Sequence, residues 1–183
     1  MLHLITGGSG SGKSAYAEAQ VMSAGIEKKI YIATMIPYGE EGRQRVERHR
    51  ELHKEKKFDT LECYTGLENL TVPTDCAVLL ECMSNLVANE MFEPKGAHER
   101  TVDAVIKGIH CLADQAGQLF IVTNEIFSDG ISYDPDTQKY LEYLGEVNQK
   151  IAEMADTVTE VVYGIPLRLK EKGVTDETML EQP

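Results

Sequence analysis

The feature that most constrains this chain is the segment GGSGSGKS at residues 7–14, which directly follows the apolar run LHLIT. Its glycine spacing matches a loop in which consecutive backbone N–H groups turn inward around a polyphosphate. In such a loop, Lys13 reaches the outer phosphates, Ser14 ligates Mg²⁺, and the following helix directs its positive end at the anion. The sequence therefore predicts a nucleotide-binding loop made of Gly7, Gly8, Ser9, Gly10, Ser11, Gly12, Lys13 and Ser14.

A flexible linker is the alternative interpretation, because glycine and serine also make up flexible loops. The flanking residues argue against a linker. LHLIT has the composition of a buried strand, and SAYAEAQVMSAG, at residues 14–25, consists of helix formers closed by a glycine. We therefore expect strand, loop and helix in this order, although the loop alone does not identify the reaction.

The length and charge of the chain limit its organisation and its partners. A chain of 183 residues can bury one good core but hardly two, so we predict a single domain over residues 1–170 and a polar tail over residues 171–183. The net charge of −12 argues against a protein that coats nucleic acid or an anionic membrane. Small molecules are therefore the expected partners.

The sequence also bears on the compartment of the protein. The predicted loop begins at residue 7, which leaves no room for a secretory signal, and no apolar stretch approaches the length of a transmembrane helix. We therefore expect a cytoplasmic protein. The cysteines form no C-x-x-C pair, so reduced thiols that fill the core are expected rather than a zinc site.

Short apolar runs recur along the chain and alternate with helical stretches. After the first run they occupy residues 29–34, 60–64, 77–81, 119–124 and 157–164. Continuous apolar strands are typical of a parallel sheet that is covered by helices on each side. The last run, IPLRLK, follows a Gly-Ile turn and should pair antiparallel. The expected fold is α/β and P-loop NTPase-like, with a mostly parallel sheet flanked by helices and an antiparallel C-terminal edge hairpin.

The residues that end each apolar run are candidate site residues, because ligands of such sheets collect beyond the carboxyl ends of the strands. Glu81 closes AVLLE, where P-loop proteins place an acidic residue that holds Mg²⁺; a solvated or helix-capping carboxylate is the alternative. Asn124 and Glu125 are candidates for hydrogen bonding a substrate, or for capping a turn. We also assign Glu62, in the run at 60–64, to the nucleotide-binding set.

The segment YGEEGRQRVERHRELHKEKKF, residues 38–58, concentrates basic residues and two histidines in an acidic protein. On a helix, Arg45, His49 and His53 are spaced four residues apart and lie on one face. A solvated charged helix is the alternative, because glutamates at matching spacing can pair with the cations. Histidines flanked by arginines also fit phosphate chemistry, since arginine binds phosphate bidentately and neutral imidazole is a nucleophile.

Six blocks of the chain occur in the order found in one known family. They are LITGGSGSGKS, YIAT, RVERHRELH, LLECMSNLVANEMF, IVTNEIFSDGI and LGEVNQKIAEMADTVTEVVYGIPLRLK. Through this ordered set the chain resembles the bifunctional adenosylcobinamide kinase/adenosylcobinamide-phosphate guanylyltransferases of cobalamin assembly. Only the nucleotide-binding loop is a strong motif by itself, so the resemblance depends on the order.

The resemblance implies two reactions. The enzyme would phosphorylate adenosylcobinamide with ATP or GTP, and would then transfer GMP from GTP to adenosylcobinamide phosphate through a guanylyl-histidine. The histidine of the family follows an Arg-Ile/Val pair, which places it at His49 in RVERH and leaves His53 as the weaker candidate.

The resemblance also implies the roles of other residues and the assembly. Lys13 would be catalytic, and Ser14 and Glu81 would hold Mg²⁺. The flanking cations would stabilise the charge of the transferred group; they are Arg45, Arg48 and Arg50. The family further implies a homo-oligomer, a trimer or a related form.

The chain departs from the family pattern at NEIFSDGISYD, residues 124–134, where relatives commonly carry N-E-V-G-x-G-I-V-P. A glycine and the proline are lost and Phe127 is gained, which concerns the corrinoid side of the reaction. Two other functions stay open here: a P-loop kinase for another small alcohol, without guanylyl transfer, and a nucleotide-sensing regulator. The chain has no N-K-x-D base-reading motif, which weighs against the regulator.

Overall fold

The structure is a computed structural model that describes residues 1–40, 42, 44, 47, 56–127, 130 and 133–173. Its elements, in chain order, are β1 (Leu2–Thr6), α1 (Lys13–Ser23), β2 (Lys29–Ala33), β3 (Phe58–Glu62), the short 3-10 helix η1 (Leu67–Asn69), β4 (Ala77–Glu81), α3 (Met83–Phe92), the 3-10 helix η2 (His98–Arg100), α4 (Thr101–Gln115), β5 (Gln118–Val122), α5 (Pro135–Met154), β6 (Thr157–Val162) and β7 (Ile165–Glu171). Strands and helices therefore alternate over most of the chain.

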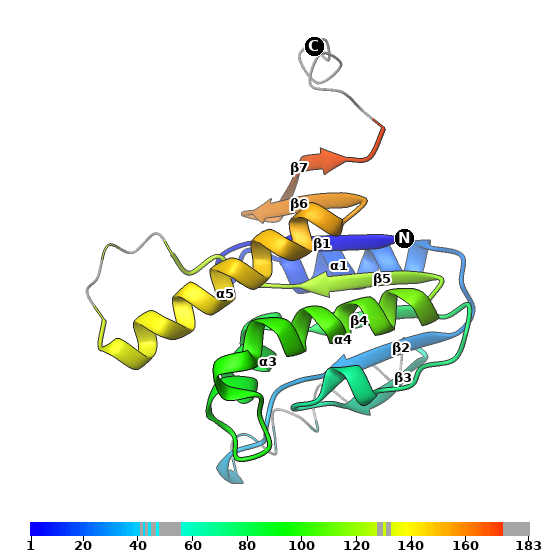
Figure 1. The fold of residues 1–183 in the computed structure, drawn as a ribbon. Helices are drawn as coiled ribbons and strands as arrows, with labels where there is room; N and C mark the ends of the chain where they lie inside the picture. Colours follow the sequence, from blue (N-terminus) through cyan, green and yellow to red (C-terminus); the bar gives the residue numbers. More distant parts are fainter. Residues whose placement is uncertain are drawn as a thin grey trace.

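Within the described ranges the strands form one sheet in the order β3-β2-β4-β5-β1-β6-β7 (Figure 1). The strands from β3 to β6 in this order pair parallel, and only β7 pairs antiparallel, with β6. The carboxyl ends of the parallel strands therefore meet at one edge of the sheet. This confirms the predicted mixed sheet with an antiparallel C-terminal hairpin.

Helices cover both faces of the sheet. Figure 1 shows α1 behind the sheet and α3, α4 and α5 in front of it. Alternate residues of β1 supply the two cores: Leu2 and Leu4 belong to the core under α3, α4 and α5, whereas Ile5 packs with Ala17 and Val21 of α1. Burial on both faces explains why the strand sequences are continuously apolar rather than alternating.

The beginning of α5 is encoded locally. The side chain of Asp134 accepts hydrogen bonds from the backbone N–H groups of Asp136 and Thr137, and Pro135 occupies the first turn. Aspartate is a favourable residue immediately before a helix, and proline fits the first helical position. The helix therefore begins directly after the NEIFSDGISYD segment.

Several strands begin or end one or two residues from the expected positions, and two of these differences change the role of a residue. The strand expected at residues 60–64 is β3 at Phe58–Glu62, and Cys63 instead follows the strand as a buried core residue. The expected Gly-Ile turn before β7 is a Tyr163–Gly164 turn, because Val162 pairs with Ile165. β7 extends to Glu171; the boundaries of the single domain and the tail stay predictions.

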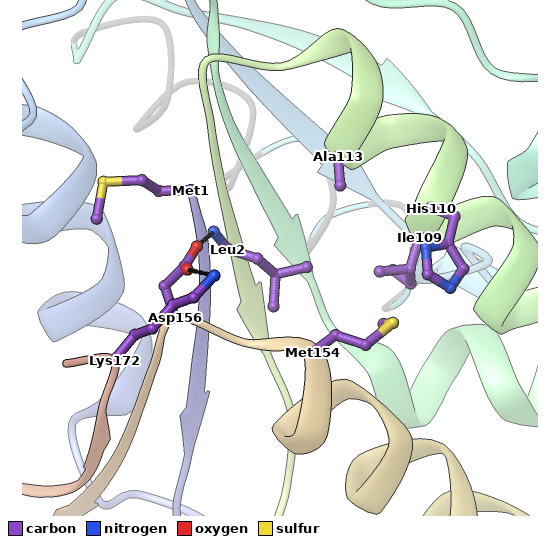
Figure 2. A pocket seen from close by; sticks show the side chains of 8 residues that line it. All are labelled: Met1, Leu2, Ile109, His110, Ala113, Met154, Asp156 and Lys172. Carbon is purple, nitrogen blue, oxygen red and sulfur yellow. Dashed lines mark hydrogen bonds and ion pairs between the residues drawn. The ribbon is translucent and has the colours of Figure 1, made fainter. Parts of the chain in front are cut away.

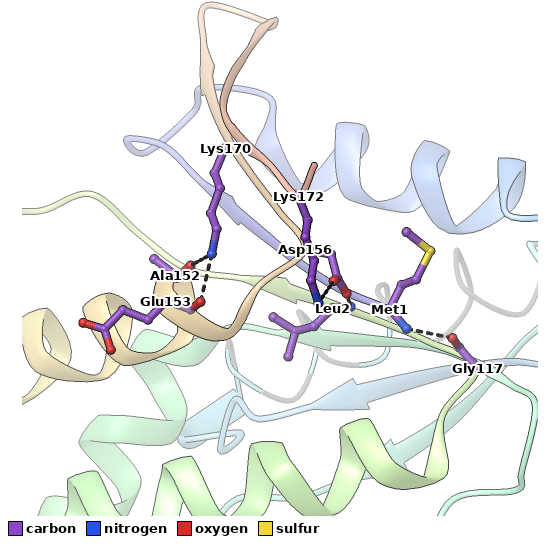
Figure 3. Close-up of polar contacts among 8 residues, drawn as sticks. All are labelled: Met1, Leu2, Gly117, Ala152, Glu153, Asp156, Lys170 and Lys172. Atoms are coloured by element: carbon purple, nitrogen blue, oxygen red, sulfur yellow. Dashed lines mark hydrogen bonds and ion pairs between the residues drawn. The ribbon is translucent and has the colours of Figure 1, made fainter. Parts of the chain in front are cut away.

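Backbone and side-chain contacts tie the chain together at the amino edge of the sheet (Figure 3). The terminal ammonium of Met1 donates to Gly117 O (3.1 Å), and Leu2 N donates to Asp156 Oδ2 (2.8 Å). Lys172 Nζ lies 3.2 Å from Asp156 Oδ1. These contacts join the start of β1 to the ends of α4, α5 and β7.

A cavity of about 300 Å³ opens beside these contacts (Figure 2). Its lining combines apolar side chains of α4 and α5, such as Ile109 and Met154, with Asp156 and Lys172. None of the residues assigned to nucleotide binding from the sequence lines it. The predicted loop lies at the opposite edge, where the parallel strands end.

Candidate nucleotide-binding site

The loop between β1 and α1 needs glycine at two positions. Gly7 has φ 153°, and a Cβ there would lie 2.5 Å from Val161 O. Gly12 has φ 92°, and its Cβ would lie 3.4 Å from Gly164 Cα. The backbone therefore takes a course that L side chains rarely adopt, and it does so against the end of β6. This geometry explains the glycine spacing that identified the loop.

Lys13 lies over the loop at the start of α1. Its Nζ donates to Gly8 O at 3.0 Å, and the residue is only 8% exposed. Ser11 N also donates to Gly8 O, at 3.2 Å. The Gly8 carbonyl therefore accepts from both the loop backbone and the Lys13 ammonium. A lysine and the first N–H groups of a helix together form an anion-binding site.

Ser14, in the first turn of α1, is hydrogen-bonded to Glu81, the last residue of β4. Ser14 Oγ donates to Glu81 Oε1 at 2.5 Å, although Glu81 ends β4 and β5 separates β4 from β1. The serine hydroxyl retains its lone pairs while its proton faces the carboxylate, so both groups present oxygen ligands of the kind that Mg²⁺ prefers. The donor set therefore fits the predicted metal, with phosphate oxygens and water as further ligands.

Tyr31 of β2 is buried near Glu81. Burial, followed by the Glu81 carboxylate, raises the pKa of the Tyr31 hydroxyl. Tyr31 belongs to the core on the α1 face, where its ring packs edge-on against Phe58 at 6.3 Å between centroids. The buried Tyr31 phenol near Glu81 therefore stays neutral at ordinary pH.

The two polar residues that follow β5, Asn124 and Glu125, lie near the loop. Glu125 N donates to Gly7 O (3.1 Å), and Asn124 Nδ2 donates to Ser84 Oγ (2.6 Å). The predicted candidates Asn124 and Glu125 are therefore at the same edge as the loop. Asn89, by contrast, is buried and donates to Thr34 O (2.8 Å), so it holds the end of β2.

Glu62 lies apart from the loop. It ends β3, the edge strand, and β2, β4 and β5 stand between β3 and β1. Tyr64 Oη donates to Glu62 Oε2 at 2.8 Å. The structure therefore does not bring Glu62 to the loop, and its assignment to nucleotide binding stays a prediction.

Of the predicted basic helix, the structure describes only part. Gly39, Glu40, Gly42, Gln44 and Glu47 have helical backbone. The remaining predicted residues of this segment lie outside the described residues: His49, His53, Arg45, Arg48 and Arg50. Their predicted roles in catalysis and nucleotide binding stay predictions.

The comparison with known proteins adds the family to this geometry. Residues 3–169 match the family described as cobinamide kinase / cobinamide phosphate guanyltransferase. The chain belongs to this family. The protein is therefore an enzyme of the cobinamide kinase/guanyltransferase family, and a nucleotide is a substrate that this family implies.

Two curated relatives are similar over nearly the whole chain. The bifunctional adenosylcobalamin biosynthesis protein CobU of Salmonella typhimurium is 31% identical over 184 residues, which are 93% of this chain and 100% of that protein. The protein of the same name from Escherichia coli is 30% identical over 187 residues, again 93% of this chain and 100% of that protein.

A solved structure of an ATPase domain supports the fold alone. It superposes on this chain with a TM-score of 0.56 at 10% sequence identity, covering 95% of this chain and 78% of that chain. The predicted P-loop NTPase-like fold of this cobinamide kinase/guanyltransferase family member is thereby confirmed.

Sequence reasoning missed the residues that support Glu81. Thr34 is buried at the end of β2; its Oγ1 accepts from Cys82 N (2.8 Å) and donates to Cys82 O (2.9 Å). Thr34 and Tyr31 reach Glu81 and Cys82 because β2 pairs with β4. Only the strand order could have indicated this, since the two segments lie far apart in the sequence.

Three further properties of the described residues bear on the predictions. No group of three or more metal-binding histidine, cysteine, aspartate or glutamate side chains occurs among the residues that the structure describes. Cys63 and Cys76 are buried in the core as predicted, whereas Cys82 and Cys111 are only partly buried. Burial raises the pKa of the Cys63 thiol to about 11. No helix within the described ranges combines the length and the apolar character that a membrane span requires.

Proposed function

We propose that this chain phosphorylates adenosylcobinamide with ATP or GTP and transfers GMP from GTP to the resulting phosphate. The observation that carries the proposal is the meeting of Lys13, Ser14 and Glu81 at the loop, in a chain that belongs to the cobinamide kinase/guanyltransferase family. The printed names of the curated relatives, bifunctional adenosylcobalamin biosynthesis proteins, agree with a pair of activities.

The phosphorylation step requires positioning and charge neutralisation more than covalent help. The loop amides and the Lys13 ammonium would hold the triphosphate at the start of α1. Ser14 and Glu81 would hold Mg²⁺, which when bound neutralises charge on the phosphate oxygens. Asn124 and Glu125 follow β5, where Glu125 N donates to Gly7 O, and would orient the acceptor hydroxyl by hydrogen bonds.

The guanylyl step would proceed through His49. A ring nitrogen of His49 attacks the α-phosphorus of GTP, the bond to the β-phosphate oxygen breaks, and pyrophosphate leaves. An oxygen of the corrinoid phosphate then attacks the same phosphorus, and the N–P bond breaks to release the histidine. The cations near His49 in the sequence would stabilise the transferred group; they are Arg45, Arg48 and Arg50.

The assembly of the enzyme is part of the same proposal. Family resemblance implies a homo-oligomer, a trimer or a related form. Light scattering under assay conditions measures the molar mass. The molar mass of a monomer would contradict the proposed homo-oligomer and leave the proposed reactions untouched.

The decisive test separates the two activities by one covalent bond. Incubating the protein with GTP and Mg²⁺, without corrinoid, should add the mass of one GMP to the chain, because His49 reacts before the acceptor arrives. The bond should be labile in acid and stable in alkali, as in a phosphoramidate. Intact-mass spectrometry measures both properties.

Variants assign the residues. His49→Ala should abolish the adduct and retain kinase turnover, His53→Ala should retain both, and Lys13→Ala should lower both because each reaction places a triphosphate on the loop. Absence of the adduct in the wild-type protein, with kinase turnover intact, would indicate a simple P-loop kinase. Absence of any corrinoid-dependent turnover would indicate a nucleotide-binding regulator.

A further inference from the structure

The hairpin between β6 and β7 turns through an unexpected residue. Its turn consists of Tyr163 and Gly164, with φ 51° and 79°, and Val162 pairs with Ile165 on either side. Two-residue hairpins with positive φ at both central positions strongly prefer Asn-Gly or a similar pair. A bulky residue such as tyrosine rarely adopts this conformation, so local folding preference does not explain Tyr163.

This turn is hydrogen-bonded to the predicted nucleotide-binding loop. Gly164 N donates to Ser11 O at 2.8 Å, and a Cβ on Gly12 would lie 3.4 Å from Gly164 Cα. Tyr163 is therefore the immediate neighbour of Gly164, which contacts the loop directly. The hairpin turn therefore lies directly against the loop.

The Tyr163 side chain has no packing role that would account for it. The residue is 94% exposed, which is the highest exposure among the large hydrophobic residues in the described part of the chain. An exposed aromatic ring beside a phosphate-binding loop is available to a ligand. Residues that break a local folding rule are expected at functional positions.

We propose that Tyr163 is the stacking platform for the base of the nucleotide whose phosphates occupy the loop. A triphosphate held by residues 7–14 leaves the sugar and base to lie on the neighbouring surface, and the Tyr163 turn is directly bonded to that loop. Aromatic side chains stack on any base, because every base has a π-face. The inference rests on the proposed function, since it requires a nucleotide at the loop.

Stacking without base reading suits an enzyme that accepts ATP or GTP for one step. It also agrees with the missing N-K-x-D motif, since a stacking residue contributes affinity and orientation rather than discrimination between purines. Tyr163 is therefore assigned as a substrate-binding residue of this chain.

Binding measurements with and without the base test the assignment. Tyr163→Asn places in the turn the residue type that this turn prefers, so the fold should be retained and the ring is lost. Its dissociation constant for GTP should rise about tenfold, whereas that for inorganic tripolyphosphate should not change. Tyr163→Phe should bind both like the wild-type protein. Phe127→Ala, which removes another exposed aromatic ring, in the segment that follows β5, is the matched control and should bind GTP normally.

A fluorescence measurement gives independent evidence. The chain contains no tryptophan, so Tyr163→Trp introduces a single reporter. GTP should quench its emission through stacking, and tripolyphosphate should not. Leu169→Trp, at an exposed position near the other end of β7, should respond to neither.

Three results would overturn the inference. Wild-type affinity for GTP in Tyr163→Asn, with the wild-type protein binding GTP, would refute the role of Tyr163 and leave the proposed function intact. A changed association state in Tyr163→Asn, with unchanged GTP affinity, would instead assign the turn to contact between copies. Failure of the wild-type protein to bind GTP and tripolyphosphate would refute the proposed function and the inference together.

Discussion

Gly7 is the residue at which the predicted nucleotide-binding loop has the least room for a side chain. A Cβ there would lie 2.5 Å from Val161 O and 2.6 Å from Ser11 Oγ, and φ is 153°. Backbone oxygen cannot move aside as a flexible side chain can. The conformation that positions the loop against β6 therefore disfavours any side chain at position 7.

We predict that Gly7→Ala lowers the free energy of unfolding by about 1–3 kcal/mol, because the loop and the end of β6 must separate. The loss should be measurable by urea denaturation at neutral pH. Gly8→Ala is the control, since a Cβ on Gly8 has no neighbour within 4 Å, and its effect should stay within about 0.5 kcal/mol. Equal losses in the two variants would contradict this explanation.

At the scale of the elements, a lysine of β7 caps the carboxyl end of α5. Lys170 Nζ donates to Ala152 O (2.9 Å) and Glu153 O (2.8 Å), as Figure 3 shows. The last carbonyl groups of a helix have no partner within the helix, and the negative end of the helix attracts a cation. One side chain thus joins the edge strand to the helix in front of the sheet.

We predict that Lys170→Met lowers the free energy of unfolding by about 1–2 kcal/mol, because two hydrogen bonds to a charged donor are lost. Lys172→Met is the matched control: Lys172 is 77% exposed and pairs only with Asp156 in the described part of the chain, and exposed pairs contribute about 0–1 kcal/mol. Chemical denaturation of both variants measures the difference. A larger loss in Lys172→Met would show that the helix end is not the stabilised group.

Sequence reasoning was most accurate where a local rule determines the element. AVLLE became β4 with the expected ends because every residue before Glu81 is buried, and the loop at 7–14 carries its own geometric requirement for glycine. The turn before β7 was placed one residue late, because tyrosine favours strands and no local rule places it in a turn. Tyr31 and Thr34 could not be assigned to Glu81, because the pairing of β2 with β4 arises only from the whole sheet.

At the scale of the whole molecule, the two edges of the sheet have different roles. The predicted nucleotide-binding groups of the loop and Glu81 lie at the carboxyl edge, whereas contacts of Met1, Leu2 and Asp156 hold the chain together at the amino edge. The backbone N–H of Leu2, followed by Lys172, lowers the pKa of the Asp156 carboxyl. Stability from Asp156 is therefore lost only in strong acid, as pH falls below the ordinary range of an aspartate.

His3 makes the stability of the same edge depend on pH in a milder range. Its Nδ1 lies 2.9 Å from Thr157 Oγ1, and its ring stacks on Phe120 with 4.5 Å between centroids. Burial, followed by the terminal ammonium, lowers the pKa of His3 below its ordinary value of 6.5. Within the folded protein, His3 therefore stays neutral at pH values where the unfolded chain already binds a proton.

The direction of the effect follows from proton binding. Below pH 6.5 the unfolded state binds more protons than the folded state, so the free energy of unfolding falls as pH falls and is fully recovered above that value. Urea denaturation should therefore show that the free energy of unfolding falls less in His3→Gln than in the wild-type protein between about pH 7.5 and about pH 5. This comparison holds even if the two proteins differ in stability at the higher pH. Parallel curves for wild type and His3→Gln would mean that His3 titrates alike in the folded and unfolded chains, and that burial between β6 and Phe120 does not govern its charge.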